Sequence, residues 1–175
     1  MTLYIVSGYS LGDYISANGW RKAARLVFKD PRLVWQMAGS GLMRRCARSR
    51  RVHVLIESGG MVFDRQFRSD SITTPGTVLN RVDVEGYMEI PRQGPQVPLR
   101  PGARSSSVLR VTLGYLILFL TRGRCRWCLP EDCITTAKWY LDRAGIRVPQ
   151  KVWTADGLLA CLEEQGYSFV PHRNR

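Results

Sequence analysis

Histidine is scarce in this chain, which has only two imidazole groups, His53 and His172, among 175 residues. Any site that needs an imidazole base must therefore use one of these two. Long hydrophobic runs are also missing, because the longest, residues 108–121, is shorter than the roughly 20 residues of a membrane-spanning helix and contains Arg110. This run predicts a buried core element instead.

The sequence begins without the basic and apolar segments of a secretory signal peptide, so we expect no export signal. Its cysteines number five, which is odd, and this argues against a disulfide framework. Free thiols, a metal site or a catalytic thiol are the remaining roles for these side chains. The compartment itself is left open by these observations.

Negative charge is in short supply, because 14 Asp and Glu against 26 Lys and Arg give a net charge of +12. Within the first 52 residues, only Asp13 and Asp30 oppose ten basic side chains. Such an excess favours an anionic partner, although it also suits a solvated face. The predicted contacts with an anionic cell wall, membrane or nucleic acid are Arg44, Arg45, Arg48, Arg50 and Arg51.

The length and the ordinary hydrophobic content of 45% predict one globular domain with a proper core. Apolar residues at helical spacing predict helices over 17–37, with a break at Pro31, and Gly39-Ser-Gly41 predicts the end of the second helix. The fold class predicted is α+β, with helices towards both ends and a small antiparallel sheet between them. The boundaries expected are a basic helical extension over 1–50, a domain over 51–170 and a polar tail over 171–175.

The middle of the chain carries strand patterns. Two β-rich segments, 51–57 and 61–67, flank Ser58-Gly-Gly60 and predict a hairpin. Alternating apolar and acidic residues over 80–90 predict a third strand, and Pro91–Ser107 predicts a surface loop. Further helices are expected over 131–144 and from the N-cap residue Thr154 onwards.

Cys133 lies in the first turn of the predicted helix over 131–144, where backbone N–H groups and the helix dipole favour a thiolate. A thiolate nucleophile needs a base, which His53 would supply, and the base needs an orienting partner. The hairpin places Asp64 roughly opposite His53, while Glu57 shares a face of the strand with it. Amides at the same helix start, including that of Cys133, could stabilise an oxyanion.

Two segments resemble motifs of the NlpC/P60 papain-like superfamily. Arg51-Val-His-Val-Leu-Ile-Glu-Ser-Gly-Gly-Met-Val-Phe-Asp64 is similar to its histidine hairpin, and Pro130-Glu-Asp-Cys-Ile-Thr-Thr-Ala-Lys-Trp-Tyr-Leu141 is similar to its nucleophile helix. The hairpin precedes the helix here, an order that resembles the circularly permuted branch of the superfamily. Val152-Trp-Thr-Ala-Asp-Gly-Leu-Leu resembles a Trp-Thr-Pro-like helix start of phage members, with Ala155 in place of the proline.

The resemblance covers roughly 51–165 and implies a papain-like domain with a small antiparallel sheet packed on a Cys-bearing helix. It implies that Cys133 is the nucleophile, His53 the base and Asp64 the third member, where the family usually has His, Asn or Gln. Glu57 and Asp132 are secondary candidates. The implied activity is that of a cysteine amidase or peptidase without a cofactor, acting on a peptide or cell-wall substrate such as peptidoglycan.

The phage-type members to which the chain is similar imply a bacteriophage protein, carried in the virion with other virion proteins or present in the host cytoplasm. A non-catalytic structural virion component with the same fold is the first alternative. A basic nucleic-acid-binding protein is the second, because tryptophans accompany the arginines. A zinc or redox site at Cys125-Arg-Trp-Cys128 is a further hypothesis, but zinc requires four ligands and a second cysteine pair is missing, so we expect no metal.

Overall fold

The computed structural model describes residues 1–65, 70–81, 83–91, 113, 116–117, 120–121 and 132–172. Within these residues the chain is an α+β protein built around one antiparallel sheet, as the sequence predicts. The strands of this sheet are β1 (Thr2–Ser7), β2 (Arg51–Ser58), β3 (Met61–Arg65), β4 (Asp70–Thr73), β5 (Val84–Glu89) and β6 (Phe169–Pro171). The helices are α1 (Leu11–Asn18), α2 (Trp20–Lys29), α3 (Pro31–Ala47), α4 (Pro75–Leu79), α6 (Cys133–Arg143) and α7 (Ala155–Glu163).

The strand order in the sheet is β4-β3-β2-β1-β5-β6, so the first strand of the chain lies at its centre. β1 pairs antiparallel with β2 on one side and with β5 on the other. The segment 1–50, predicted as a helical extension, therefore contributes a central strand as well as three helices. The residues of β1 are almost all buried, which agrees with a strand covered on both faces.

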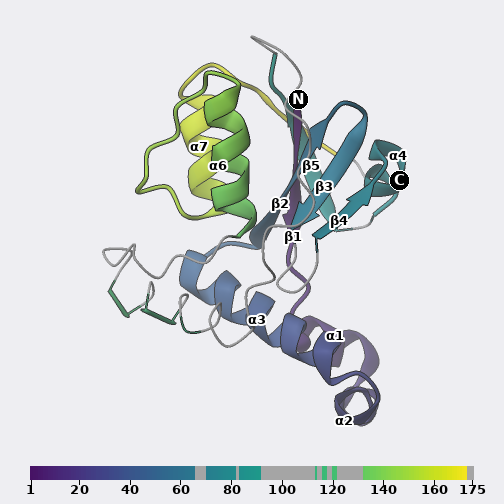
Figure 1. The fold of residues 1–175 in the computed structure, drawn as a ribbon. Helices are drawn as coiled ribbons and strands as arrows, with labels where there is room; N and C mark the ends of the chain where they lie inside the picture. The colour runs from purple at the N-terminus through teal and green to yellow at the C-terminus, as the bar shows by residue number, and fades with distance from the viewer. Residues whose placement is uncertain are drawn as a thin grey trace.

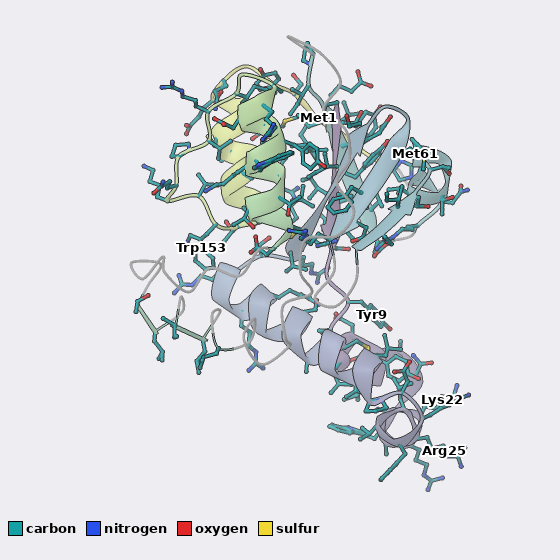
Figure 2. The ribbon with its side chains drawn as sticks, in the orientation of Figure 1. Met1, Tyr9, Lys22, Arg25, Met61 and Trp153 are labelled. Atoms are coloured by element: carbon teal, nitrogen blue, oxygen red, sulfur yellow. The ribbon has the colours of Figure 1, made fainter. Side chains whose placement is uncertain are left out.

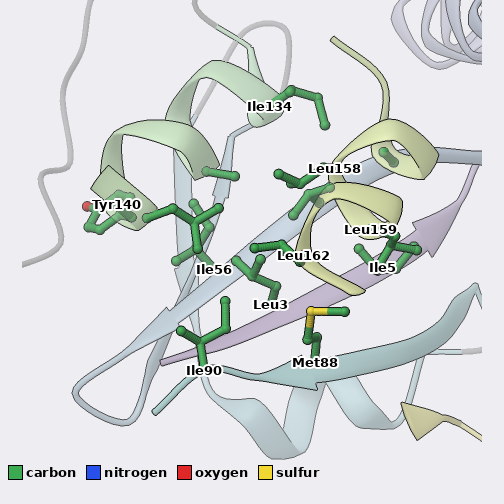
Figure 3. Close-up of a cluster of buried hydrophobic side chains, with 14 of the residues drawn as sticks. Leu3, Ile5, Ile56, Met88, Ile90, Ile134, Tyr140, Leu158, Leu159 and Leu162 are labelled. Atoms are coloured by element: carbon green, nitrogen blue, oxygen red, sulfur yellow. The ribbon is translucent and has the colours of Figure 1, made fainter. Parts of the chain in front are cut away.

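The larger core lies between the sheet and the helices α6 and α7, which stand side by side on one face (Figures 1 and 3). Helix α7 contributes the buried leucines at 158, 159 and 162, and α6 contributes Ile134, Ala137 and Leu141. A smaller core lies on the opposite face, where Val78 of α4 packs against side chains of β1, β2 and β3. The sheet is thus a middle layer, and α6 is held on it by apolar contacts along most of its length.

The helices α1, α2 and α3 extend away from one end of the sheet (Figure 1). Pro31 begins α3, as predicted, but the predicted break at Gly39-Ser-Gly41 is wrong, because α3 continues to Ala47. Small residues at this point serve close packing instead: a Cβ on Gly8 would clash with the Ser40 Oγ, and a Cβ on Gly41 would lie 3.4 Å from Ser10. A glycine inside a helix costs about 1 kcal/mol, but the small residues here let the segment after β1 approach α3 closely.

The apolar run over 108–121 is not buried at its described leucines. Leu113, Leu116 and Leu120 are all exposed, so the prediction of a buried core element is wrong for these positions. The hydrophobic run predicts burial, but it carries no information on whether another element covers these side chains. Most of the remainder of this run, and the predicted loop from residue 92 onwards, lie outside the described residues. In the described part of the chain, no helix has the length and hydrophobicity needed to cross a membrane.

Candidate active site

His53 and Asp64 are brought together by the hairpin of β2 and β3. The strands pair Ile56 with Phe63 and Ser58 with Met61 around a two-residue turn. Both turn residues, Gly59 and Gly60, have left-handed backbone angles (φ of 66° and 77°), a conformation that glycine adopts at little cost. The Ser58-Gly-Gly60 sequence therefore fixes the register of the hairpin.

In this register Asp64 is level with Leu55, two residues from His53 along β2, so the contact between the two side chains is diagonal. The sequence predicts Asp64 roughly opposite His53, and the register shows that it lies two residues along from that position. Alternation nevertheless places both side chains on the same face of the sheet. The Nε2 atom of His53 lies 2.7 Å from the Asp64 Oδ1 atom, and the Asp64 side chain is almost completely buried.

Arg81, in the segment before β5, completes the surroundings of the buried carboxylate. Its Nη1 atom lies 3.3 Å from the second oxygen of Asp64, Oδ2. The guanidinium is itself held by Asp83, which accepts from its Nε at 2.9 Å and from its Nη2 at 2.7 Å. Asp64 therefore bridges His53 and Arg81, which restrains the carboxylate in one orientation.

Cys133 is the first residue of α6 and reaches the same site from the helical layer. The helix begins there because Asp132 caps it: the Asp132 Oδ1 accepts from the Thr135 amide at 2.8 Å, and the Thr135 hydroxyl accepts from the Asp132 amide. The Cys133 thiol is buried, lies 4.0 Å from the carbonyl oxygen of Val52, the residue before His53, and is close enough to His53 to interact with it electrostatically. Because Nε2 of His53 is bonded to Asp64, Nδ1 is the ring nitrogen that remains for the thiol.

The pairing of β1 with β2 is irregular next to His53. The register of β1 with β2 shifts between Val6, which pairs with His53, and Ser7, which pairs with Arg51. Val52, between these partners, is thus an extra residue in β2, immediately before His53. Such bulges redirect neighbouring side chains and are common next to active sites.

The electrostatics of the site favour a protonated His53. Burial of the ring lowers its pKa, but the interactions with a negatively charged Cys133 and with Asp64 outweigh this, and the pKa of His53 is raised to about 10. Near neutral pH the site therefore supports an imidazolium between a carboxylate and a thiol.

The start of α6 also supplies backbone donors. The amide of Thr135 is used by the Asp132 cap, and that of Thr136 donates to the Asp132 carbonyl oxygen at 3.0 Å. The amides of Cys133 and Ile134 lie ahead of these in the first turn, where a helix has no carbonyl of its own to offer. They are the donors nearest in sequence to the sulfur. They suit the stabilisation of the oxyanion that forms when the sulfur attacks a carbonyl group.

The two secondary candidates have other roles. Glu57 accepts a 2.7 Å hydrogen bond from the hydroxyl of Tyr4 across the β1–β2 pair. Burial and this bond raise the pKa of Tyr4 above its usual range. Asp132 is engaged as the N-cap of α6, so it positions Cys133 by defining where the helix begins.

The five arginines predicted to contact an anionic partner divide into two groups. Arg44 forms an ion pair with Asp13, and Arg51 pairs with Glu85 at 2.8 Å and with Asp156 at 3.3 Å. These two hold elements of the protein together. Arg45, Arg48 and Arg50 are exposed and, with Arg44, line an open cavity of about 640 Å³ between α1 and α3.

The described residues contain no group of three or more His, Cys, Asp or Glu side chains that could hold a metal ion. Cys125 and Cys128, which carry the zinc and redox hypotheses, lie outside the described part of the chain. His172, the other histidine, is bonded through Nε2 to the Leu79 carbonyl oxygen at 3.0 Å and lies at the end of the sheet.

Comparison with known proteins gives no relatives: no family model, no curated protein and no solved structure matches this chain. The site must therefore be judged on its own geometry. Of the residues predicted from sequence, the structure brings Cys133, His53 and Asp64 together. Arg81 was missed, because a single arginine beside an aspartate before a strand gives no signal of a contact with a residue 17 positions away.

Proposed function

We propose that this protein is a papain-like cysteine hydrolase of the permuted NlpC/P60 type, with Cys133 as nucleophile, His53 as base and Asp64 as orienting residue. The 2.7 Å hydrogen bond between His53 and the buried Asp64, beside the Cys133 thiol at the start of α6, carries this proposal. Two residues of one hairpin and a third from a helix distant in sequence lie in the order nucleophile, base and orienting acid, which is the arrangement that nucleophilic catalysis requires.

The mechanism follows from these contacts. The thiolate of Cys133 attacks a carbonyl carbon, and the amides of Cys133 and Ile134 donate to the oxygen that becomes negative. The imidazolium of His53 gives its proton to the departing amine or alcohol, which leaves an acyl thioester on the sulfur. His53, now neutral, takes a proton from water while the resulting hydroxide attacks the thioester carbon. The sulfur leaves as a thiolate when the acid is released, and this restores the thiolate–imidazolium pair.

The substrate class is an amide or ester, and peptidoglycan peptides are the candidate that the resemblance implies. The burial of Asp64 supports an active site over a degenerate one, because a buried carboxylate is costly unless it is paired, and both of its oxygens are engaged here, one of them by the proposed base. A virion-borne hydrolase of bacterial cell walls would fit the predicted phage origin.

An activated ester, p-nitrophenyl acetate, tests the proposal without knowledge of the natural substrate. We expect stoichiometric acetylation of Cys133, seen by peptide mass spectrometry, followed by turnover. Cys133→Ala should abolish both steps, with an unchanged circular dichroism spectrum. The matched control, Cys161→Ala, removes a more exposed thiol from α7 and should retain full activity. A Cys133→Ala protein that still turns over the ester, or acetylation that falls on Cys161 instead, would refute the assignment.

A further inference from the structure

Helix α2 leaves an apolar face uncovered. Trp20 is 75% exposed, Val27 45% and Phe28 90%, and Ala24 is exposed between them. Positions 20, 24, 27 and 28 share one face of an α-helix, because they are spaced by four, seven and eight residues. Single exposed apolar residues are ordinary, but a continuous apolar stripe with two aromatic rings indicates an interaction surface.

The same helix is divided into three sectors. Ala23 is buried and Leu26 half-buried, and this edge packs against α1 and α3. The exposed apolar stripe lies next to it. All four charged residues of the helix, Arg21, Lys22, Arg25 and Lys29, are basic, exposed and confined to the remaining side.

The position of α2 suits contact with a large flat partner. It lies at the end of the molecule farthest from the sheet, with α1 and α3 between (Figure 1). The side chains of Lys22 and Arg25 project outward from this tip (Figure 2). The acid nearest to α2 in sequence, Asp30, is engaged as the N-cap of α3, where it accepts from the Leu33 amide at 3.0 Å.

We propose that α2 docks the protein on the surface of an anionic phospholipid bilayer, lying in the plane of the interface. The stripe of Trp20, Ala24, Val27 and Phe28 would enter the boundary between headgroups and acyl chains, while the four basic side chains meet lipid phosphates. A basic, strongly amphipathic helix of modest length has the properties of such an interfacial element. Tryptophan suits this depth, because its ring is apolar and its indole N–H remains able to donate. The inference is independent of catalysis by Cys133.

Two other occupants fit the observations less well. A second copy of the chain would bring the four basic residues of one α2 close to those of the other, with no acid on the helix to offset the repulsion. A nucleic acid would use the arginines and lysines, but it has no use for the aliphatic Val27 in the middle of the apolar stripe. A bilayer uses both sectors at once.

Co-sedimentation of the full chain with lipid vesicles tests the proposal. At about 0.15 M salt, the protein should bind vesicles with about 30% phosphatidylglycerol at least about tenfold more tightly than pure phosphatidylcholine vesicles. The double variant Trp20→Ser with Phe28→Ser should lose about tenfold or more of this affinity. Met61→Ser with Ile72→Ser, which removes two exposed apolar residues from the strands β3 and β4, away from α2, should bind as the wild type does.

A charge-matched pair separates specific docking from general attraction. Lys22→Glu with Arg25→Glu should abolish binding, whereas Arg147→Glu with Lys151→Glu changes the net charge equally and should leave most of it. Equal losses in both pairs, or no effect of the Trp20 and Phe28 substitutions, would overturn the proposal. Two other results would also overturn it. One is a wild-type dimer that the Trp20 and Phe28 substitutions dissociate. The other is binding to DNA that is tighter than binding to anionic vesicles and is lost in the same variant.

Discussion

In the proposed site, the carboxylate of Asp64 orients the His53 ring and favours its protonated form. It is almost fully buried, accepts from Nε2 of His53 and is restrained by Arg81. The chain has only two histidines, so each imidazole can be followed individually by nuclear magnetic resonance. This makes the effect of Asp64 on His53 directly measurable.

We expect His53 to titrate with a midpoint of about 10 in the wild-type protein, because Cys133 and Asp64 both favour its charged form. In Asp64→Asn the midpoint should fall by about 1 to 3 units, since a nearby opposite charge contributes about that much. The signals of His172, which is bonded to the Leu79 carbonyl at the end of the sheet, serve as an internal check of the fold. Asp156→Asn, the same chemical change at a surface ion pair with Arg51, should leave the His53 midpoint in place. A wild-type midpoint near 6.5 would contradict the arrangement.

The helices α6 and α7 both begin at an N-cap residue, but the two caps have different roles. Asp132 caps α6 and Thr154 caps α7, each through a hydrogen bond to the amide three residues on, at 2.8 Å and 3.0 Å. Only the first cap holds a residue of the proposed site. The two helices therefore provide a matched pair for separating stability from reactivity.

Asp132→Ala and Thr154→Ala should each lower the free energy of unfolding by about 1 kcal/mol, the usual cost of losing an N-cap. Only Asp132→Ala should also slow the reaction of Cys133 with iodoacetamide, because it loosens the first turn of α6, where the sulfur and its neighbouring amides lie. Chemical denaturation gives the first quantity, and residue-mapped alkylation gives the second. Equal alkylation rates in the two variants would show that the cap has no part in the site.

The elements with local signals were the ones that the sequence could predict. The two glycines define the β2–β3 turn, and the acids and Thr154 mark the starts of α6 and α7. The place of β1 between β2 and β5 was not predictable, because nothing in the segment 2–7 specifies which strands it joins. The continuation of α3 past Gly39 was missed because its small residues serve a contact with the distant Gly8.

The residues of the candidate site also divide into those that local sequence patterns predict and those that depend on tertiary structure. Cys133, His53 and Asp64 could be proposed from the helix start and the hairpin, since each carries a recognisable local pattern. The diagonal contact and the role of Arg81 depend on strand register and on a loop that returns to the sheet. These are tertiary features, which local periodicity does not contain.

For the whole molecule, the raised pKa of His53 links the site to folding stability. A group whose pKa is higher in the folded than in the unfolded state stabilises most fully below its unfolded pKa, here about 6.5, and this contribution is lost as the pH rises through the folded pKa, here about 10. The wild type should therefore exceed Asp64→Asn in unfolding free energy most near pH 6.5, and the excess should shrink towards pH 10. Each unit of difference between their His53 pKa values corresponds to about 1.4 kcal/mol. Urea denaturation across this range measures the excess, and a difference that does not vary with pH would exclude His53 as its source.

Residue-mapped alkylation with iodoacetamide near pH 7 tests whether Cys133 reacts as a thiolate held by His53, as proposed. Exposure alone favours reaction at the half-exposed Cys161 over the buried Cys133. We expect the reverse, with Cys133 alkylated faster than Cys161. In His53→Ala the fast reaction of Cys133 should be lost, while the rate at Cys161 is unchanged. Slower alkylation of Cys133 than of Cys161, or a Cys133 rate that His53→Ala leaves unaltered, would contradict it.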